Sequence, residues 1–205
     1  DSVRKEMVGF LFLDQDLPQL HAALSDSLPA ASHRSLLQVL RTVNDSSTPD
    51  QIEAAYPAWS AEVQVAALNC LGEIGTEKAL DAWRRLLLSS PPSGKPGSIR
   101  LVFAPLYAVP ARLGGMFPDL LALREEPGYA AAVVEALAIG LQAGSVPPAA
   151  LRSHSESLLQ TLNRTLKERD QQEKGTAAHQ QATRLAEDLS LCLAYVPEQP
   201  AVNQW

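Results

Sequence analysis

The histidines and cysteines are the side chains of this chain best suited to chemistry, and their spacing assembles no site. None of the histidines stands three or four residues from another histidine or from a cysteine, the spacings at which one helix face holds a metal. No nucleophile-elbow pattern accompanies them, so a serine–histidine mechanism is not predicted. We therefore expect no catalytic residue, no metal and no cofactor. The histidines are His21, His33, His154 and His179.

The two cysteines, Cys70 and Cys192, lie far apart in the sequence and each falls in an apolar helical stretch. Free cysteine is among the most frequently buried residue types, so two buried, reduced thiols are the favoured interpretation. A single disulfide between them is the alternative.

The clearest structural pattern runs from Ser60 to Ser90, SAEVQVAALNCLGEIGTEKALDAWRRLLLSS. Apolar residues recur there at three- and four-residue spacing, which predicts two amphipathic helices. Ser60 and Thr76 are suited to cap the helix starts, and Gly75 suits a left-handed cap between them. The predicted inward residues, with Leu71 and Leu80 expected to be buried, are Val63, Ala66, Ala67, Cys70, Leu71 and Ile74, then Ala79, Leu80, Trp83, Leu86 and Leu87.

The rest of the chain carries weaker versions of the same pattern. A shift of 69 residues places the segment after residue 60 on the segment after residue 129, which is about two periods of roughly 34 residues. Helices are predicted at 1–14, at 147–172 and at 178–196, while 91–97 is predicted to be a mobile loop.

Two prolines interrupt the helical pattern that follows the loop. Pro105 and Pro110 are each expected to bend or break that helix, because proline removes a backbone hydrogen bond and its ring clashes with the preceding turn.

Residues 60–90 resemble one repeat of the HEAT class, in the variety also found in phycobilisome-type bilin lyases. The resemblance rests on the acidic first turn, the small-residue core, LGEIG and the leucine spacing of the second helix. Trp83 and Arg84 stand where that family usually has leucine and acidic residues. The shared pattern concerns packing, so it does not carry the lyase activity of some relatives to this chain.

The resemblance implies an all-α fold: a right-handed α-solenoid of antiparallel helix pairs. One helical-repeat domain is expected over residues 1–196, with the two longer C-terminal helices as its cap, followed by a tail at 197–205.

In HEAT-like stacks the second helix of each pair lines the concave face, which implies a binding surface for a protein or peptide. The residues placed there by the resemblance are Trp83, Arg84, Arg85, Phe117 and Arg124. Because arginine recognises carboxylates well, an acidic partner segment is expected. The alternatives are that Trp83 packs between helices and that Arg84 and Arg85 form solvated ion pairs.

Composition limits the remaining function classes. The chain of 205 residues is 46% hydrophobic and 5% aromatic, with a net charge of −6. The negative charge argues against general nucleic-acid binding, and no apolar run reaches the roughly 20 residues of a membrane span. A cytoplasmic protein is expected, although the start at Asp1 is typical of an excised or processed piece that could have lost a targeting or membrane segment.

We therefore predict a non-enzymatic interaction or scaffold module, with no prediction of its oligomeric state. One alternative is a HEAT-like enzyme, either a bilin-type lyase or a base-excision enzyme. The other is a regulatory or oligomerisation domain cut from a larger, membrane-bound or soluble, protein.

Overall fold

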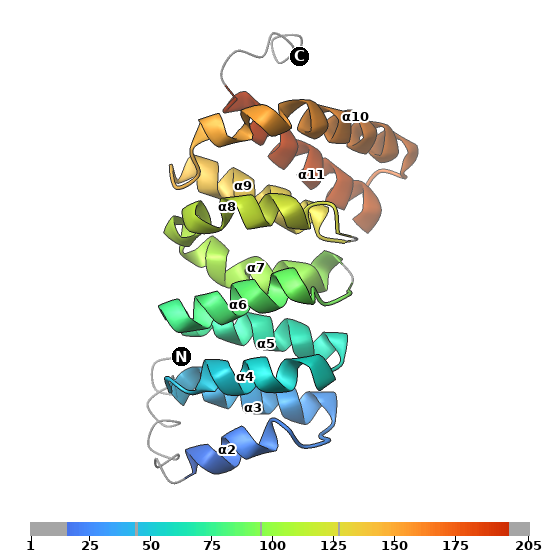
Figure 1. Ribbon diagram of the computed structural model, residues 1–205. Coiled ribbons are helices and arrows are strands. Elements are labelled where there is room, and N and C mark those ends of the chain that lie inside the picture. The colour runs from blue at the N-terminus through green and yellow to red at the C-terminus, as the bar shows by residue number, and fades with distance from the viewer. Residues whose placement is uncertain (1–15, 44, 95, 127, 197–205) are drawn as a thin grey trace. The chain divides into compact units, whose positions relative to one another are not determined.

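The computed structural model describes residues 16–43, 45–94, 96–126 and 128–196 (Figure 1). The fold of these residues is all-α, as predicted, and no strand occurs among them. The predicted helix at 1–14 and the tail at 197–205 lie outside them. The elements in chain order are α2 (Leu17–Ala23), α3 (Ala30–Val43), α4 (Thr48–Ala55), η1 (Tyr56–Ala58), α5 (Ala61–Ile74), α6 (Glu77–Ser89), α7 (Pro96–Ala108), η2 (Pro110–Arg112), α8 (Leu113–Leu123), α9 (Ala130–Gln142), η3 (Pro148–His154), α10 (Ser155–Gln171) and α11 (Ala177–Ala194).

Contacts divide the chain into two compact units, Asp1–Pro105 and Leu106–Trp205, with the boundary inside α7. These are called unit 1 and unit 2 below. The single domain expected over residues 1–196 stays a prediction.

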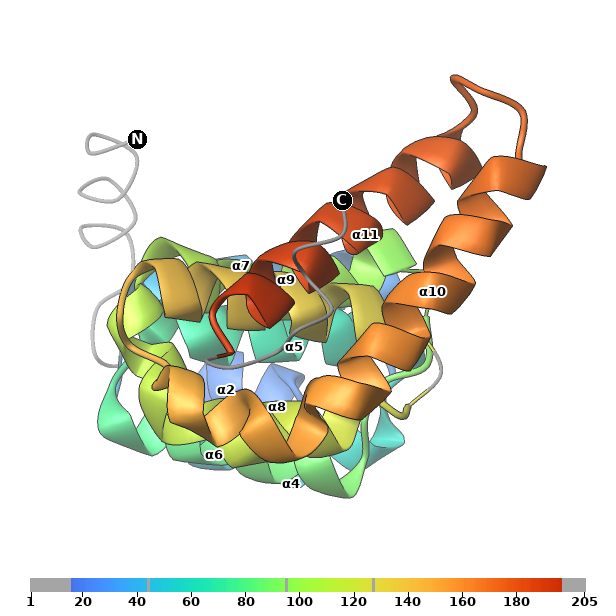
Figure 2. The ribbon, with the colours of Figure 1, turned by 90° about the horizontal axis from the view of Figure 1, so that it is seen from above.

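In unit 1, helices pack on their second neighbours as well as their first. Helix α5 packs on both α3 and α6, and α4 packs on α6. Figure 2 shows α4 and α6 on one side of this unit and α5 on the other. Two layers of helices therefore enclose the core of unit 1.

Of the three local signals predicted at residues 60–76, those at Gly75 and Thr76 have the predicted outcome. Gly75 ends α5 with φ of 66°, a left-handed conformation that glycine adopts without strain. The hydroxyl of Thr76 accepts a hydrogen bond from the backbone N–H of Ala79 and so caps α6. Ser60 precedes α5 in an extended conformation, but its side chain makes no capping hydrogen bond.

The buried face of α6 differs from the predicted one. Leu80 is only half-buried, whereas Ala82 is 1% exposed. The core stripe runs through Ala79, Ala82 and Trp83, which places Leu80 at its edge. Leu71 on α5 is fully buried, as predicted.

Of the two outcomes predicted for Pro105, a break does not occur, and α7 continues through this residue to Ala108. Its ring lies against Gly72 of α5, where the missing side chain leaves room for it. A Cβ atom placed on Gly72 would lie 2.8 Å from Cγ of Pro105. The second proline, Pro110, begins the short helix η2.

In unit 2, α9 packs on α8 and α11, and α10 packs on α11. Helices α10 and α11 are 17 and 18 residues long, which agrees with the longer C-terminal pair expected from the sequence. The first of them begins at Ser155 because η3 occupies the residues before it.

Both cysteines are buried and free, in accordance with the favoured interpretation. Cys70 is 3% exposed and Cys192 is inaccessible. Burial raises the pKa of each thiol to about 12.

Candidate functional site

Two of the five residues expected on a binding face belong to the core. Trp83 is 2% exposed and packs edge-on against Phe103 in unit 1, with ring centroids 6.0 Å apart. Phe117 in α8 of unit 2 is 7% exposed. Neither ring is presented to a partner, and for Trp83 the packing alternative is the correct one.

The two arginines on α6 are exposed. Arg85 donates from Nε and Nη2 to the two carboxylate oxygens of Glu53 on α4, both at 2.8 Å. This fork lowers the pKa of the Glu53 carboxyl, chiefly through the hydrogen bond from Arg85. Arg84 is exposed beside it. For Arg85, the ion-pair alternative therefore describes the structure.

Arg124 is turned inward within unit 2. Its side chain is 8% exposed, and Nη2 donates to Glu125 at 2.6 Å and to Ser157 of α10 at 2.8 Å. Burial and these partners remove Arg124 from the predicted binding set. Only Arg84 and Arg85 remain as surface candidates.

Ion pairs link neighbouring helices on both layers of unit 1. On one layer, the acids belong to α4 and the bases to α6. On the other, the bases belong to α3 and the acids to α5. The surface over α4 and α6 is therefore charge-paired rather than a positive stripe. The pairs are Asp50–Lys78 at 2.6 Å, Glu53–Arg85 at 2.8 Å, Arg34–Glu62 at 2.6 Å and Arg41–Glu73 at 2.5 Å.

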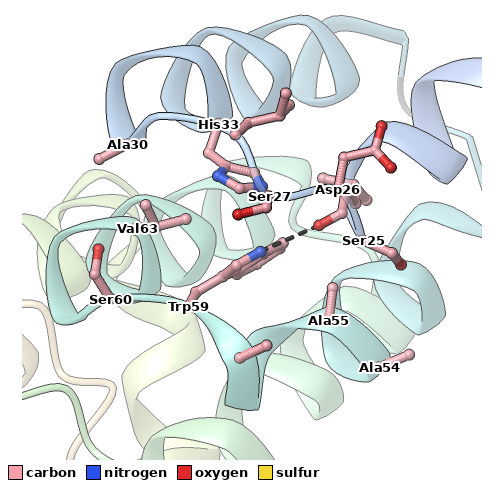
Figure 3. Close-up of a pocket in the computed structure, with 13 residues that line it drawn as sticks. Ser25, Asp26, Ser27, Ala30, His33, Ala54, Ala55, Trp59, Ser60 and Val63 are labelled. Carbon is pink, nitrogen blue, oxygen red and sulfur yellow. Dashed lines mark hydrogen bonds between the residues drawn. The ribbon is translucent and has the colours of Figure 1, made fainter.

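Sequence reasoning missed a pocket of about 660 Å³ in unit 1, where the turn after α2 meets the beginnings of α3 and α5 (Figure 3). Its walls combine aliphatic side chains with serine hydroxyls, one carboxylate and two aromatic rings. The residues that line it are Leu24, Ser25, Asp26, Ser27, Leu28, Ala30, His33, Ala54, Ala55, Ala58, Trp59, Ser60 and Val63. We call it the His33 pocket.

Two buried rings form the inner wall of the His33 pocket. The rings of His33 and Trp59 are 5.5 Å apart at an angle of 55°, and the residues are 5% and 9% exposed. Trp59 donates from Nε1 to the backbone oxygen of Leu24 at 3.2 Å, which ties the end of α2 to the start of α5. Nε2 of His33 is buried with no hydrogen-bond partner among the described residues.

Two helix N-termini border the same pocket. Ala30 is the first residue of α3, and Ser60 directly precedes α5 (Figure 3). The first N–H groups of a helix lack intrahelical partners and carry partial positive charge. Among the described residues of the lining, Asp26 is the one acid, and it is exposed. The pocket thus offers several hydrogen-bond donors around an apolar wall.

A second hollow of about 710 Å³ in unit 1 has a different character. It lies over α3, α5 and the start of α7, and Leu101, which is 55% exposed, contributes to its lining. Asn69 donates to the backbone oxygen of Leu101 at 2.9 Å and ties α5 to α7 below it.

In the described part of the chain, no cluster of three or more His, Cys, Asp or Glu side chains could hold a metal ion. Within the same residues, no helix has the length and apolarity needed to cross a membrane. Comparison with family models, with curated proteins and with solved structures finds no match to this chain.

Proposed function

We propose that this chain is a non-enzymatic interaction module built from HEAT-like helical repeats. The support is a sequence separation that recurs between hydrogen-bonded residues. Several hydrogen bonds between neighbouring helices join residues 32 to 35 positions apart, close to the period of about 34 residues in the sequence. The bonds are Tyr56–Ser90, Trp59–Leu24, Asn69–Leu101, Cys70–Leu37 and Lys78–Ser46 in unit 1, and Arg124–Ser157 in unit 2.

The packing of unit 1 supports the same proposal. First helices contact first helices, α3 with α5, and second helices contact second helices, α4 with α6. This is the arrangement that antiparallel pairs of a right-handed solenoid would have. Repeats of this kind expose a broad surface of adjacent second helices, which suits the recognition of a protein or peptide.

The observation that carries the proposal is the exposed face over α4 and α6. Its charged side chains pair across the two helices, as in Glu53–Arg85. Leu88 adds an apolar side chain, 40% exposed, near the end of α6. Charges of both signs around an apolar side chain can provide specificity for a partner with the complementary pattern.

A charge swap tests this face while keeping its fold. Glu53→Arg combined with Arg85→Glu preserves the ion pair but reverses both charges, so the stability of unit 1 should change little. Proteins captured from a lysate of the source cells are quantified for wild type and variant. We expect at least one protein to be captured at least tenfold less by the swapped variant, and its Kd is then measured by calorimetry.

The matched control is the same swap on the other layer, Arg41→Glu with Glu73→Arg, which should leave capture unchanged. Capture that survives the α4–α6 swap, or that falls equally with both swaps, would contradict a binding face on second helices.

A further inference from the structure

We propose that the His33 pocket binds a carboxylate of an acidic partner segment; this rests on the proposed function as a protein- or peptide-binding module. The inference starts from His33. Its Nε2 atom is enclosed by the protein, yet no described atom pairs with it. A buried polar atom without a partner is unusual in a native fold and marks a place where a ligand atom can complete the hydrogen bonding.

The helix beginnings at the pocket supply further donors of the right kind. Helices α3 and α5 are each 14 residues long, and both begin at the pocket, with Ala30 and Ser60 in its lining. Their first N–H groups favour an anion. The Ser60 hydroxyl makes no capping bond, whereas Thr76 and Thr176 cap the starts of α6 and α11 with theirs. The N-terminus of α5 thus has no capping hydrogen bond from the Ser60 side chain.

The charges around the pocket favour a carboxylate over a phosphate. Asp26 is an exposed acid in the lining, and it repels a dianion more than a single negative charge. Glu62, in the first turn of α5, is paired with Arg34 at 2.6 Å. The site therefore suits one negative charge that accepts hydrogen bonds from His33 and from backbone N–H groups.

The apolar wall of the His33 pocket can contact the part of the partner segment that carries the carboxylate. Leu24, Leu28 and Val63 line the pocket together with the Trp59 ring. The volume of about 660 Å³ lies within the range of small-ligand sites and accommodates an acidic side chain with its neighbours.

The test is a titration of the 205-residue chain with short peptides, followed by two-dimensional NMR of the backbone amides and the histidine ring. The probe is acetyl-Ala-Ala-Glu-Ala-Ala-amide, and the control is the same peptide with Gln in place of Glu. We expect the Glu peptide to shift the signals of Ala30, Ala61 and the His33 ring in a saturable way, and the Gln peptide to leave them unchanged. Equal shifts with both peptides would overturn the proposal.

Further arms identify the source of the anion. Acetyl-pentaalanine with a free C-terminus tests a chain-terminal carboxylate, and inorganic phosphate tests a dianion. Chemical shift changes caused by either carboxylate peptide support the proposal. The peptide that causes the larger changes shows whether the carboxylate belongs to a side chain or to a chain terminus. Shifts from phosphate that exceed those of both peptides would overturn it, as would equal shifts at the starts of α6 and α11.

One variant tests the site without unfolding it. Ser60→Asp supplies an intramolecular carboxylate and a better cap to α5, so it should fold at least as well as wild type and bind the Glu peptide at least tenfold more weakly. Thr76→Asp is the matched control at α6 and should leave binding unchanged. Undiminished affinity in Ser60→Asp would overturn the proposal.

The titration uses no natural partner, so it distinguishes the pocket from the proposed function. If the face over α4 and α6 binds a partner but the His33 pocket binds no peptide, the proposed carboxylate site is refuted and the proposed function is not. Conversely, peptide binding that persists in the Glu53→Arg, Arg85→Glu variant would show that the two surfaces act separately.

Discussion

Substituting Gly72 by alanine tests how closely α5 approaches α7. The added Cβ would lie 2.8 Å from Cγ and 2.9 Å from Cβ of Pro105, inside the contact distance of two carbon atoms. Alanine favours a helix interior over glycine by about 1 kcal/mol, while overpacking a core costs about 1–3 kcal/mol. We therefore expect Gly72→Ala to lower the free energy of unfolding by up to about 2 kcal/mol.

The assay is denaturant unfolding followed by tryptophan fluorescence, which reports on unit 1 through Trp59 and Trp83, and by circular dichroism. Gly115→Ala is the matched control, because a Cβ there meets no described atom within 4 Å and the residue lies inside α8. It should stabilise by about 1 kcal/mol. Pro105→Ala removes the Cγ contact, so the cost of Gly72→Ala should shrink in that background. Equal stabilisation by both glycine substitutions would refute the close approach.

Three further predictions concern the core, the thiols and one ion pair. Leu71→Ala should cost about 2–5 kcal/mol in calorimetric unfolding, because Leu71 is fully buried, whereas Leu80→Ala should cost less than about 2 kcal/mol; equal costs would contradict the assigned face of α6. The two buried thiols, with pKa raised to about 12, should resist a disulfide reagent at pH 8 until denaturant is added, and rapid native labelling would contradict their burial. The Glu53 pKa is lowered by Arg85, so the stability that this pair adds should be present above the unfolded carboxyl pKa and lost as the pH falls through the folded one. Glu53→Gln should therefore lower the melting temperature at neutral pH but not at acid pH, and an equal loss at both would refute the linkage.

The sequence predicted what depends on local interactions. The end of α5 at Gly75 and the cap at Thr76 follow from conformational preferences of those residues alone. Periodicity located α5 and α6 but did not fix the inward face of α6, since Ala82 and Leu80 both fit a helical stripe. Which of them is buried depends on how α6 contacts α4 and α5.

The candidate site was not predictable because its parts are distant in the sequence. Leu24, His33 and Trp59 belong to three segments, and only packing brings them together. In the sequence, His33 is a lone histidine with no partner at metal-binding or catalytic spacing. The position of Arg124 was not predictable for a similar reason: its side chain is buried and donates to Ser157 of α10, 33 residues further along the chain.

The recurring separation of about 33 residues between bonded partners also has a consequence during synthesis. Among the described residues of unit 1, the helices joined by these bonds each find their partner in the helix pair made just before them. Domains made early in translation can fold as they emerge. Each such bond closes a loop of similar length, so the entropy lost in forming one bond is similar to that lost in forming the next. Unit 1 should therefore assemble in the order of translation, while unit 2 is still being made.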